Sequence, residues 1–224
     1  MILDALFGGD FETFIVSLLL SLPIVFLSLS LHETAHGYMA YKLGDPTAHS
    51  LGRLTLNPLK HLDPFGFLCM LFFGFGWAKP VPINTRYFKK PKRDMALTGL
   101  AGPVSNLLLA ILFAILLRVE YGVLGHINIP NEFTYLCFYW LSQFLTLGVT
   151  LNVTLAVFNL LPIPPLDGSR LFLSLLPTRI YFQIMRFEQY ISVALMLALA
   201  LGWLDAPIRW LSSFVLNLIF KITF

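Results

Sequence analysis

Long uncharged stretches alternate with short polar segments along the chain, and this pattern predicts its elements. Residues 13–31, 95–117, 133–166 and 189–204 contain no Asp, Glu, Lys, Arg or His. A helix that spans a membrane needs about 20 consecutive apolar residues. We therefore predict four membrane spans. The third stretch is longer than one crossing requires, and its crossing is placed at residues 138–161.

Two further apolar stretches are too short or too interrupted for an ordinary span. Residues 64–78 contain several glycines, and basic residues flank them on both sides. Basic loops remain in the cytoplasm, so this segment is interpreted as re-entrant. Residues 207–223 form either a last crossing or a helix that lies in the membrane interface. The pattern thus predicts an all-α polytopic membrane protein with about 4–6 membrane helices.

Composition excludes a soluble domain and a nucleic-acid-binding protein. The chain is 57% hydrophobic and 12% charged, with a mean hydropathy of +0.77, whereas soluble domains carry about 45–50% apolar and about 25% charged residues. A net charge of +3 provides no basic surface for nucleic acid. Cys69 and Cys137 both lie in apolar stretches, so no disulfide framework is expected. We predict one membrane-embedded domain over residues 1–224.

The basic residues predict the orientation. If the acidic N-terminus lies outside, 13 of the 15 Lys and Arg residues face the cytoplasm, a count that includes Lys221 if the C-terminal segment crosses the membrane. Only Arg118 and Arg209 then lie outside. The opposite orientation inverts this ratio, against the observed preference for basic cytoplasmic loops.

The first apolar stretch ends in a metal-binding pattern. Residues 32–36 read HETAH, which matches H-E-x-x-H. His32 and His36 lie on one face of a helix and can bind one Zn²⁺, while Glu33 can act on water at the metal. The alternative is that the two histidines form interhelical hydrogen bonds and Glu33 pairs with one of them. Burial of three ionisable groups without a metal or partner is costly, which favours the metal site.

A catalytic zinc takes three protein ligands, and Asp167 is the leading candidate for the third. It ends the 34-residue uncharged stretch, directly after Pro162, Pro164 and Pro165. Prolines break the helix, and irregular backbone at membrane depth is tolerated only where protein buries it or water lines it. An unwound segment with a carboxylate beside a cavity suits a metal site. The helix with the histidines is expected over residues 13–43, which places His32 about 16 Å from its inner end.

These motifs resemble those of the site-2 protease family of intramembrane zinc metalloproteases, in the small bacterial or archaeal form without an added PDZ or CBS domain. Residues 32–36 match the first motif of that family, and residues 159–168 match its second, N-x-x-P-x-P-x-x-D-G. Residues 102–106 match a family segment between them. Gly102 and Pro103, with Ser105 and Asn106, either shape the site or let helices approach closely, and close packing is the favoured role. Asn106 is also a candidate for a hydrogen bond to the zinc surroundings.

The resemblance implies one Zn²⁺ per chain, held by His32, His36 and Asp167, with Glu33 as the general base. It also implies that Asn159 helps to hold the substrate or the developing oxyanion. The membrane is expected to be a prokaryotic inner membrane, with the active site toward the cytoplasmic side.

Residues 64–90 are expected to hold the re-entrant segment and a small β element near the cytoplasmic face. Lys79, Val81 and Ile83 alternate with prolines, which suits an edge strand. The resemblance implies that this element faces the membrane and pairs with an extended substrate. An interfacial loop is the alternative.

The sequence therefore predicts an intramembrane zinc endopeptidase. Its partners would be the lipid bilayer and a transmembrane protein substrate, cleaved within or near its membrane segment in regulated intramembrane proteolysis. The alternative function is a membrane transporter or metal-binding channel that uses the same His and Asp residues. Two features count against it: no inverted repeat is visible, and a transporter does not need the glutamate beside the first histidine.

Overall fold

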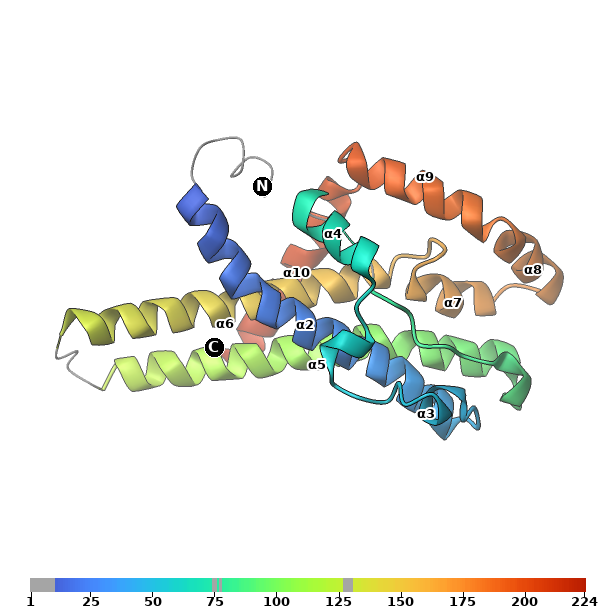
Figure 1. Cartoon of the computed structure of the whole chain (residues 1–224), viewed down its shortest axis with the longest axis horizontal. Coiled ribbons are helices and arrows are strands. Elements are labelled where there is room, and N and C mark those ends of the chain that lie inside the picture. Colours follow the sequence, from blue (N-terminus) through green and yellow to red (C-terminus); the bar gives the residue numbers. More distant parts are fainter. Residues whose placement is uncertain (1–10, 74–75, 77, 127–130) are drawn as a thin grey trace.

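Three long helices form the body of the protein (Figure 1). The computed structural model describes residues 11–73, 76, 78–126 and 131–224. The helices α2 (Phe11–Lys42), α5 (Pro91–Leu124) and α6 (Glu132–Asn159) are long and apolar enough to cross a membrane. At 1.5 Å per residue they extend about 42–51 Å, more than the hydrocarbon core of about 30 Å. They lie where the first three spans are predicted.

The helices α5 and α6 run antiparallel and side by side, and α2 crosses them (Figure 1). Gly148 of α6 faces Phe113 of α5, where a Cβ would lie 2.7 Å from the phenyl ring. Glu120 lies buried in α5, and its Oε1 accepts a hydrogen bond of 2.7 Å from Ser142 of α6. These two contacts set the register between α5 and α6.

The buried core lies mainly between these two helices and the C-terminal helix. The opposite face of α5 is exposed and apolar. In a soluble protein such a continuous apolar surface is rare, whereas it suits a helix in contact with lipid. The exposed residues of this face are Leu108, Ile111, Leu112, Ile115, Leu116 and Val119.

The fourth predicted span is not one straight helix. The helix α9 (Glu188–Ala200) has 13 residues, and α10 (Asp205–Thr223) follows at a bend of 84°. Gly202 between them has φ of +72°, a left-handed conformation that glycine adopts readily. The pair forms either a fourth, broken span or a re-entrant hairpin. The apolar stretch at residues 189–204 predicts a span but gives no sign of the bend at Gly202.

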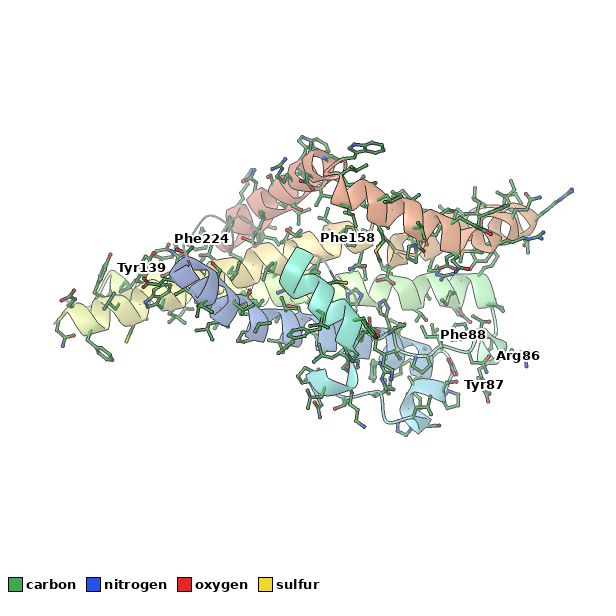
Figure 2. All side chains as sticks on the ribbon, turned by 45° about the horizontal axis from the view of Figure 1, so that its top comes forward. Arg86, Tyr87, Phe88, Tyr139, Phe158 and Phe224 are labelled. Carbon is green, nitrogen blue, oxygen red and sulfur yellow. The ribbon has the colours of Figure 1, made fainter. Side chains whose placement is uncertain are left out.

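The end of α10 lies at the C-terminal end of α5. The ring of Phe224 lies 5.9 Å from the ring of Tyr121, and the guanidinium of Arg118 lies 5.4 Å from its centroid. Figure 2 shows Phe224 toward one end of the molecule and Arg86 toward the other. Lys221 is expected at the basic end only if the C-terminal segment crosses the membrane; in the structure α10 packs along α6 toward Arg118.

The region between α2 and α5 consists of short elements joined by extended chain. These are α3 (Thr47–Ser50), η1 (Pro58–Lys60), α4 (Pro64–Phe73) and η2 (Thr85–Tyr87). At ten residues, α4 is about 15 Å long and too short to cross. Within the described ranges no strand forms, and a single β-bridge joins Leu62 to Ala78. The predicted β element and re-entrant position are not confirmed, and positions 74, 75 and 77 lie outside the described residues.

Candidate metal centre

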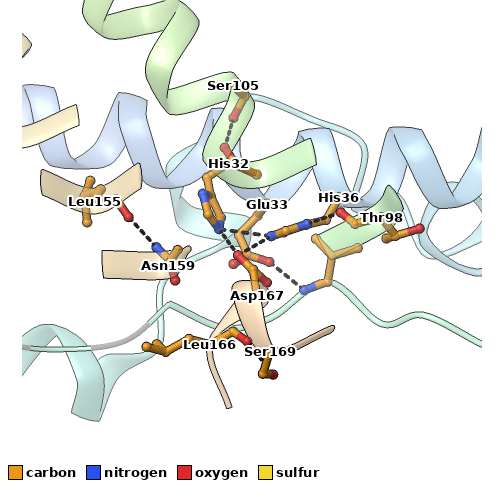
Figure 3. A network of polar contacts seen from close by, with 12 residues as sticks. His32, Glu33, His36, Thr98, Ser105, Leu155, Asn159, Leu166, Asp167 and Ser169 are labelled. Atoms are coloured by element: carbon orange, nitrogen blue, oxygen red, sulfur yellow. Dashed lines mark hydrogen bonds and ion pairs between the residues drawn. The ribbon is translucent and has the colours of Figure 1, made fainter. Parts of the chain in front are cut away.

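Two imidazoles on α2 and one carboxylate from a distant segment meet at one point (Figure 3). The Nε2 atoms of His32 and His36 lie 3.0 Å apart. Asp167 Oδ2 lies 3.0 Å from the Nε2 of His32 and 3.2 Å from the Nε2 of His36. Both histidines are buried, and Asp167 is partly buried. The structure thus brings together the three residues that the sequence predicts as metal ligands.

The break between α6 and α7 (Asp167–Ser174) positions the carboxylate of Asp167 beside the two histidines. Helix α6 ends at Asn159, the proline-rich turn follows, and Asp167 begins α7. Gly168 packs directly against that turn, where a Cβ would lie 2.2 Å from the carbonyl oxygen of Leu160. Real Cβ atoms do not approach backbone so closely, so only glycine fits after Asp167. The Asp-Gly pair of the motif therefore has a steric basis.

Glycine is also required on the opposite wall. A Cβ on Gly102 of α5 would lie 2.4 Å from Nε2 of His36 and 2.6 Å from Nε2 of His32. The missing side chain leaves the imidazole nitrogens room beside the α5 backbone. The close helix approach expected at Gly102 is confirmed. Because Gly102 has no Cβ, α5 packs against the two imidazoles without blocking their Nε2 atoms.

The group fits a zinc ion. Two ligand atoms of a tetrahedral zinc at 2.0–2.1 Å are separated by about 3.3 Å, close to the 3.0–3.2 Å between the three atoms here. The Nδ1 of His36 lies 2.7 Å from the carbonyl oxygen of Thr98, so a proton on Nδ1 leaves the Nε2 lone pair for a metal. Two imidazoles and a carboxylate are a ligand set of catalytic zinc sites.

The carboxylate is held in the ionised form that ligates metals. Burial alone would raise the pKa of Asp167, but hydrogen bonding to His32 and His36 outweighs burial and holds this pKa below its usual range. An ionised carboxylate beside two imidazoles balances part of the charge of a divalent cation.

Glu33 points toward the same space but is not part of the triad (Figure 3). Its Oε2 accepts a hydrogen bond of 2.8 Å from the backbone N–H of Val81. The extended chain around Val81 is itself fixed, because Arg53 donates to the carbonyl of Lys79 at 2.8 Å. Glu33 is thus oriented by a segment far away in the sequence.

Asn159 lies near the site at the end of α6 (Figure 3). Its side-chain amide donates a hydrogen bond of 2.9 Å to the carbonyl of Leu155, within the same helix. Among the described residues, no hydrogen bond joins Asn159 to the three ligand atoms. The sequence did not predict that the Thr98 carbonyl contacts His36 or that the Val81 N–H binds Glu33, because backbone groups leave no side-chain signal.

The match to a protein family covers most of the chain. The family model described as Peptidase family M50 matches residues 20–202. The chain belongs to peptidase family M50. This is the site-2 protease family, as the resemblance of the motifs predicts, and the matched range includes all three motif segments.

The curated relatives of this M50 chain are all named as zinc metalloproteases. A protein of Bacillus subtilis (strain 168), named "Putative zinc metalloprotease YwhC", is 46% identical over 166 residues, which cover 73% of this chain and 72% of the relative. "Putative zinc metalloprotease Rip2" of Mycobacterium tuberculosis (strain Erdman) is 32% identical over 195 residues, covering 83% and 70%. "Putative zinc metalloprotease MJ0611" of Methanocaldococcus jannaschii is 30% identical over 156 residues, covering 70% of each. No solved structure matches.

This M50 chain is therefore a membrane-embedded zinc metalloprotease, and zinc is its cofactor. The transporter or metal-channel alternative is not favoured. Together with the apolar helices, family membership makes it an integral membrane protein.

Proposed function

We propose that this protein hydrolyses a peptide bond within or near the transmembrane segment of a membrane-protein substrate, as in regulated intramembrane proteolysis. The observation that carries the proposal is the meeting of His32, His36 and Asp167 beside Glu33, between helices long enough to span a bilayer. Ionisable groups inside membrane helices are costly and are usually retained for function.

The proposed roles follow from position and chemistry. His32, His36 and Asp167 hold one Zn²⁺ per chain. Zinc, when bound, supplies a Lewis acid that makes water nucleophilic at neutral pH. Glu33 takes the proton from the attacking water and delivers it to the leaving amine. The Val81 N–H binds one oxygen of the Glu33 carboxylate and so limits its rotation.

Asn159 is proposed to assist as a hydrogen-bond donor to the substrate carbonyl or the developing oxyanion. Its amide is at present bonded to Leu155, so this role requires that the amide exchange that bond for one to the substrate. Such an exchange is possible at the last residue of a helix, where the backbone is least constrained.

The substrate must reach the site in an extended form. The backbone carbonyls of a helical segment are bonded within the helix, so the segment has to unwind near the scissile bond. The extended chain on both sides of Val81 lies next to Glu33, which supports the proposal that it pairs with the unwound substrate as an added strand.

The proposed setting is the inner membrane of a prokaryotic cell, with the N-terminus outside. Helix α2 ends at Lys42, ten residues after His32, which places the site about 15 Å from the inner end of that helix. Water and the proton from hydrolysis would then exchange with the cytoplasm.

Cleavage of a membrane substrate by purified protein tests the proposal. Wild type in lipid nanodiscs should cleave a transmembrane test protein, and mass spectrometry should locate the cut in or near its membrane segment. Glu33→Gln should retain zinc and lose cleavage. Glu132→Gln, an exposed glutamate at the start of α6, should behave as wild type. Cleavage at the wild-type rate by Glu33→Gln would refute the role of Glu33.

A further inference from the structure

Within the described part of the chain, several buried polar atoms on α2 and α5 lack hydrogen-bond partners. Among the described residues, none is found for Nδ1 of His32, for Oγ of Ser28, or for either amide atom of Asn106. Ser28 is 0% exposed and Asn106 is 1% exposed. Inside a bilayer, lipid offers such groups no hydrogen bonds, so native structures satisfy them internally.

The register between α2 and α5 places Ser28, His32 and Asn106 at similar heights along the two helix axes. His36 contacts the Thr98 carbonyl, and Gly102 faces both histidines, so the two helices run antiparallel here. One turn beyond Gly102 is Asn106, and one turn before His32 is Ser28. Both therefore lie on the outer side of the His32 ring, away from the cytoplasmic end of α2.

The two histidines differ in what orients them. The Nδ1 of His36 has a backbone carbonyl as its partner, whereas the Nδ1 of His32 has none within the described ranges. Metal-binding histidines almost always donate the second ring N–H to a carboxylate, a carbonyl or water, which fixes the ring and its tautomer. A partner for His32 is therefore expected on the side where Asn106 and Ser28 lie.

We propose that Asn106 is a positioning residue for His32. Its amide, together with the hydroxyl of Ser28, holds an ordered water that accepts a hydrogen bond from the Nδ1–H of His32. A buried water requires two to four polar partners, and these three side chains supply them. This inference rests on the proposed zinc site, and it assigns a function to the third motif segment, residues 102–106, beyond helix packing.

The zinc affinity of Asn106→Leu tests the proposal. Leucine has nearly the shape of asparagine and no hydrogen-bonding group. Competition with a chelator should show zinc bound about 10–100-fold more weakly than in wild type. Asn106→Ser, which keeps a polar group, should recover most of the affinity. The absorption spectrum of the Co²⁺-substituted protein should also change in Asn106→Leu, because the His32 ring is less fixed.

Asn152→Leu is the matched control. Asn152 of α6 is 0% exposed, and its Oδ1 also lacks a partner in the described part of the chain. Because Gly148 faces Phe113, Asn152 lies opposite a position of α5 about one turn further from the ligands than Asn106. Its replacement should leave zinc affinity unchanged, even if it alters the melting temperature.

Two results would overturn the proposal. One is a folded Asn106→Leu protein with wild-type zinc affinity. The other is equal weakening of zinc by Asn152→Leu, which would indicate a general effect of core polarity. If Asn106→Leu does not fold, Ser28→Ala decides the matter, with about tenfold weaker zinc expected and unchanged affinity overturning the proposal. Wild type that binds zinc but cleaves no membrane substrate would contradict the proposed function alone.

Discussion

Asp167 Oδ2 lies 3.0 Å from Nε2 of His32, although 135 positions separate the two residues. The contact depends on two interruptions of regular structure. The proline-rich turn after α6 interrupts the helix and places Asp167 at the start of α7, and Gly168 lets that turn pack against α7. The carboxylate of Asp167, at the start of α7, thereby reaches the two histidines of the continuous helix α2.

The first prediction concerns zinc content. His32→Ala, His36→Ala and Asp167→Ala should each lose the zinc that wild type carries, because each removes one of three ligand atoms. Elemental analysis of the purified proteins measures this. Asp205→Ala, at an exposed carboxylate of α10, should keep one zinc per chain. Full occupancy in Asp167→Ala would remove that residue from the site.

The metal ligands could be predicted because their signal is local. The spacing of His32 and His36 and the carboxylate after the prolines can be read along the chain. The bend at Gly202 and the position of Lys221 could not be predicted, because apolar length does not give the direction of a helix. The burial of Glu120 could not be predicted either, because its hydrogen-bond donor Ser142 lies on another helix.

The second prediction uses two glycines of α5. In Gly102→Ala the new Cβ would lie 2.4 Å from Nε2 of His36, so one imidazole or the α5 backbone has to move. Zinc affinity and the melting temperature should both fall. Gly122 has open space around its Cβ position, and Gly122→Ala should be neutral or stabilising by up to about 1 kcal/mol.

Thermal unfolding and chelator competition on both alanine variants provide the measurement. Since the two changes are chemically identical and lie in the same helix, helix propensity cancels between them. Zinc bound by Gly102→Ala as tightly as by wild type would show that the close approach to the histidines is not needed for metal binding.

The third prediction concerns topology. Lys60 and Lys89 belong to segments that the distribution of basic residues predicts to be cytoplasmic, whereas Phe224 packs against Arg118 at the opposite end of the molecule. Single cysteines at these three positions, in a protein without Cys69 and Cys137, should therefore label from different sides. Lys60→Cys and Lys89→Cys should react from the cytoplasm and Phe224→Cys from outside. Labelling of the first two from opposite sides would show that residues 64–78 cross the membrane.

The last prediction separates two roles of Asn159. As a donor to the substrate or oxyanion, it should be needed for turnover but not for the metal. Asn159→Ala should then keep zinc and lower the cleavage rate by about 10²–10³. As a purely structural residue, bonded to Leu155 at the end of α6, it should affect stability instead, with the rate per folded molecule nearly unchanged.

Asn131, at the other end of the same helix, provides the control for Asn159. Its Oδ1 accepts the N–H of Thr134 and caps α6, so Asn131→Ala should lower stability by about 1 kcal/mol without changing turnover. Zinc content, melting temperature and cleavage rate are measured on one preparation of each variant. If Asn159→Ala behaves like Asn131→Ala, with lower stability and wild-type turnover, Asn159 is a helix-terminating residue and the oxyanion has its donors elsewhere.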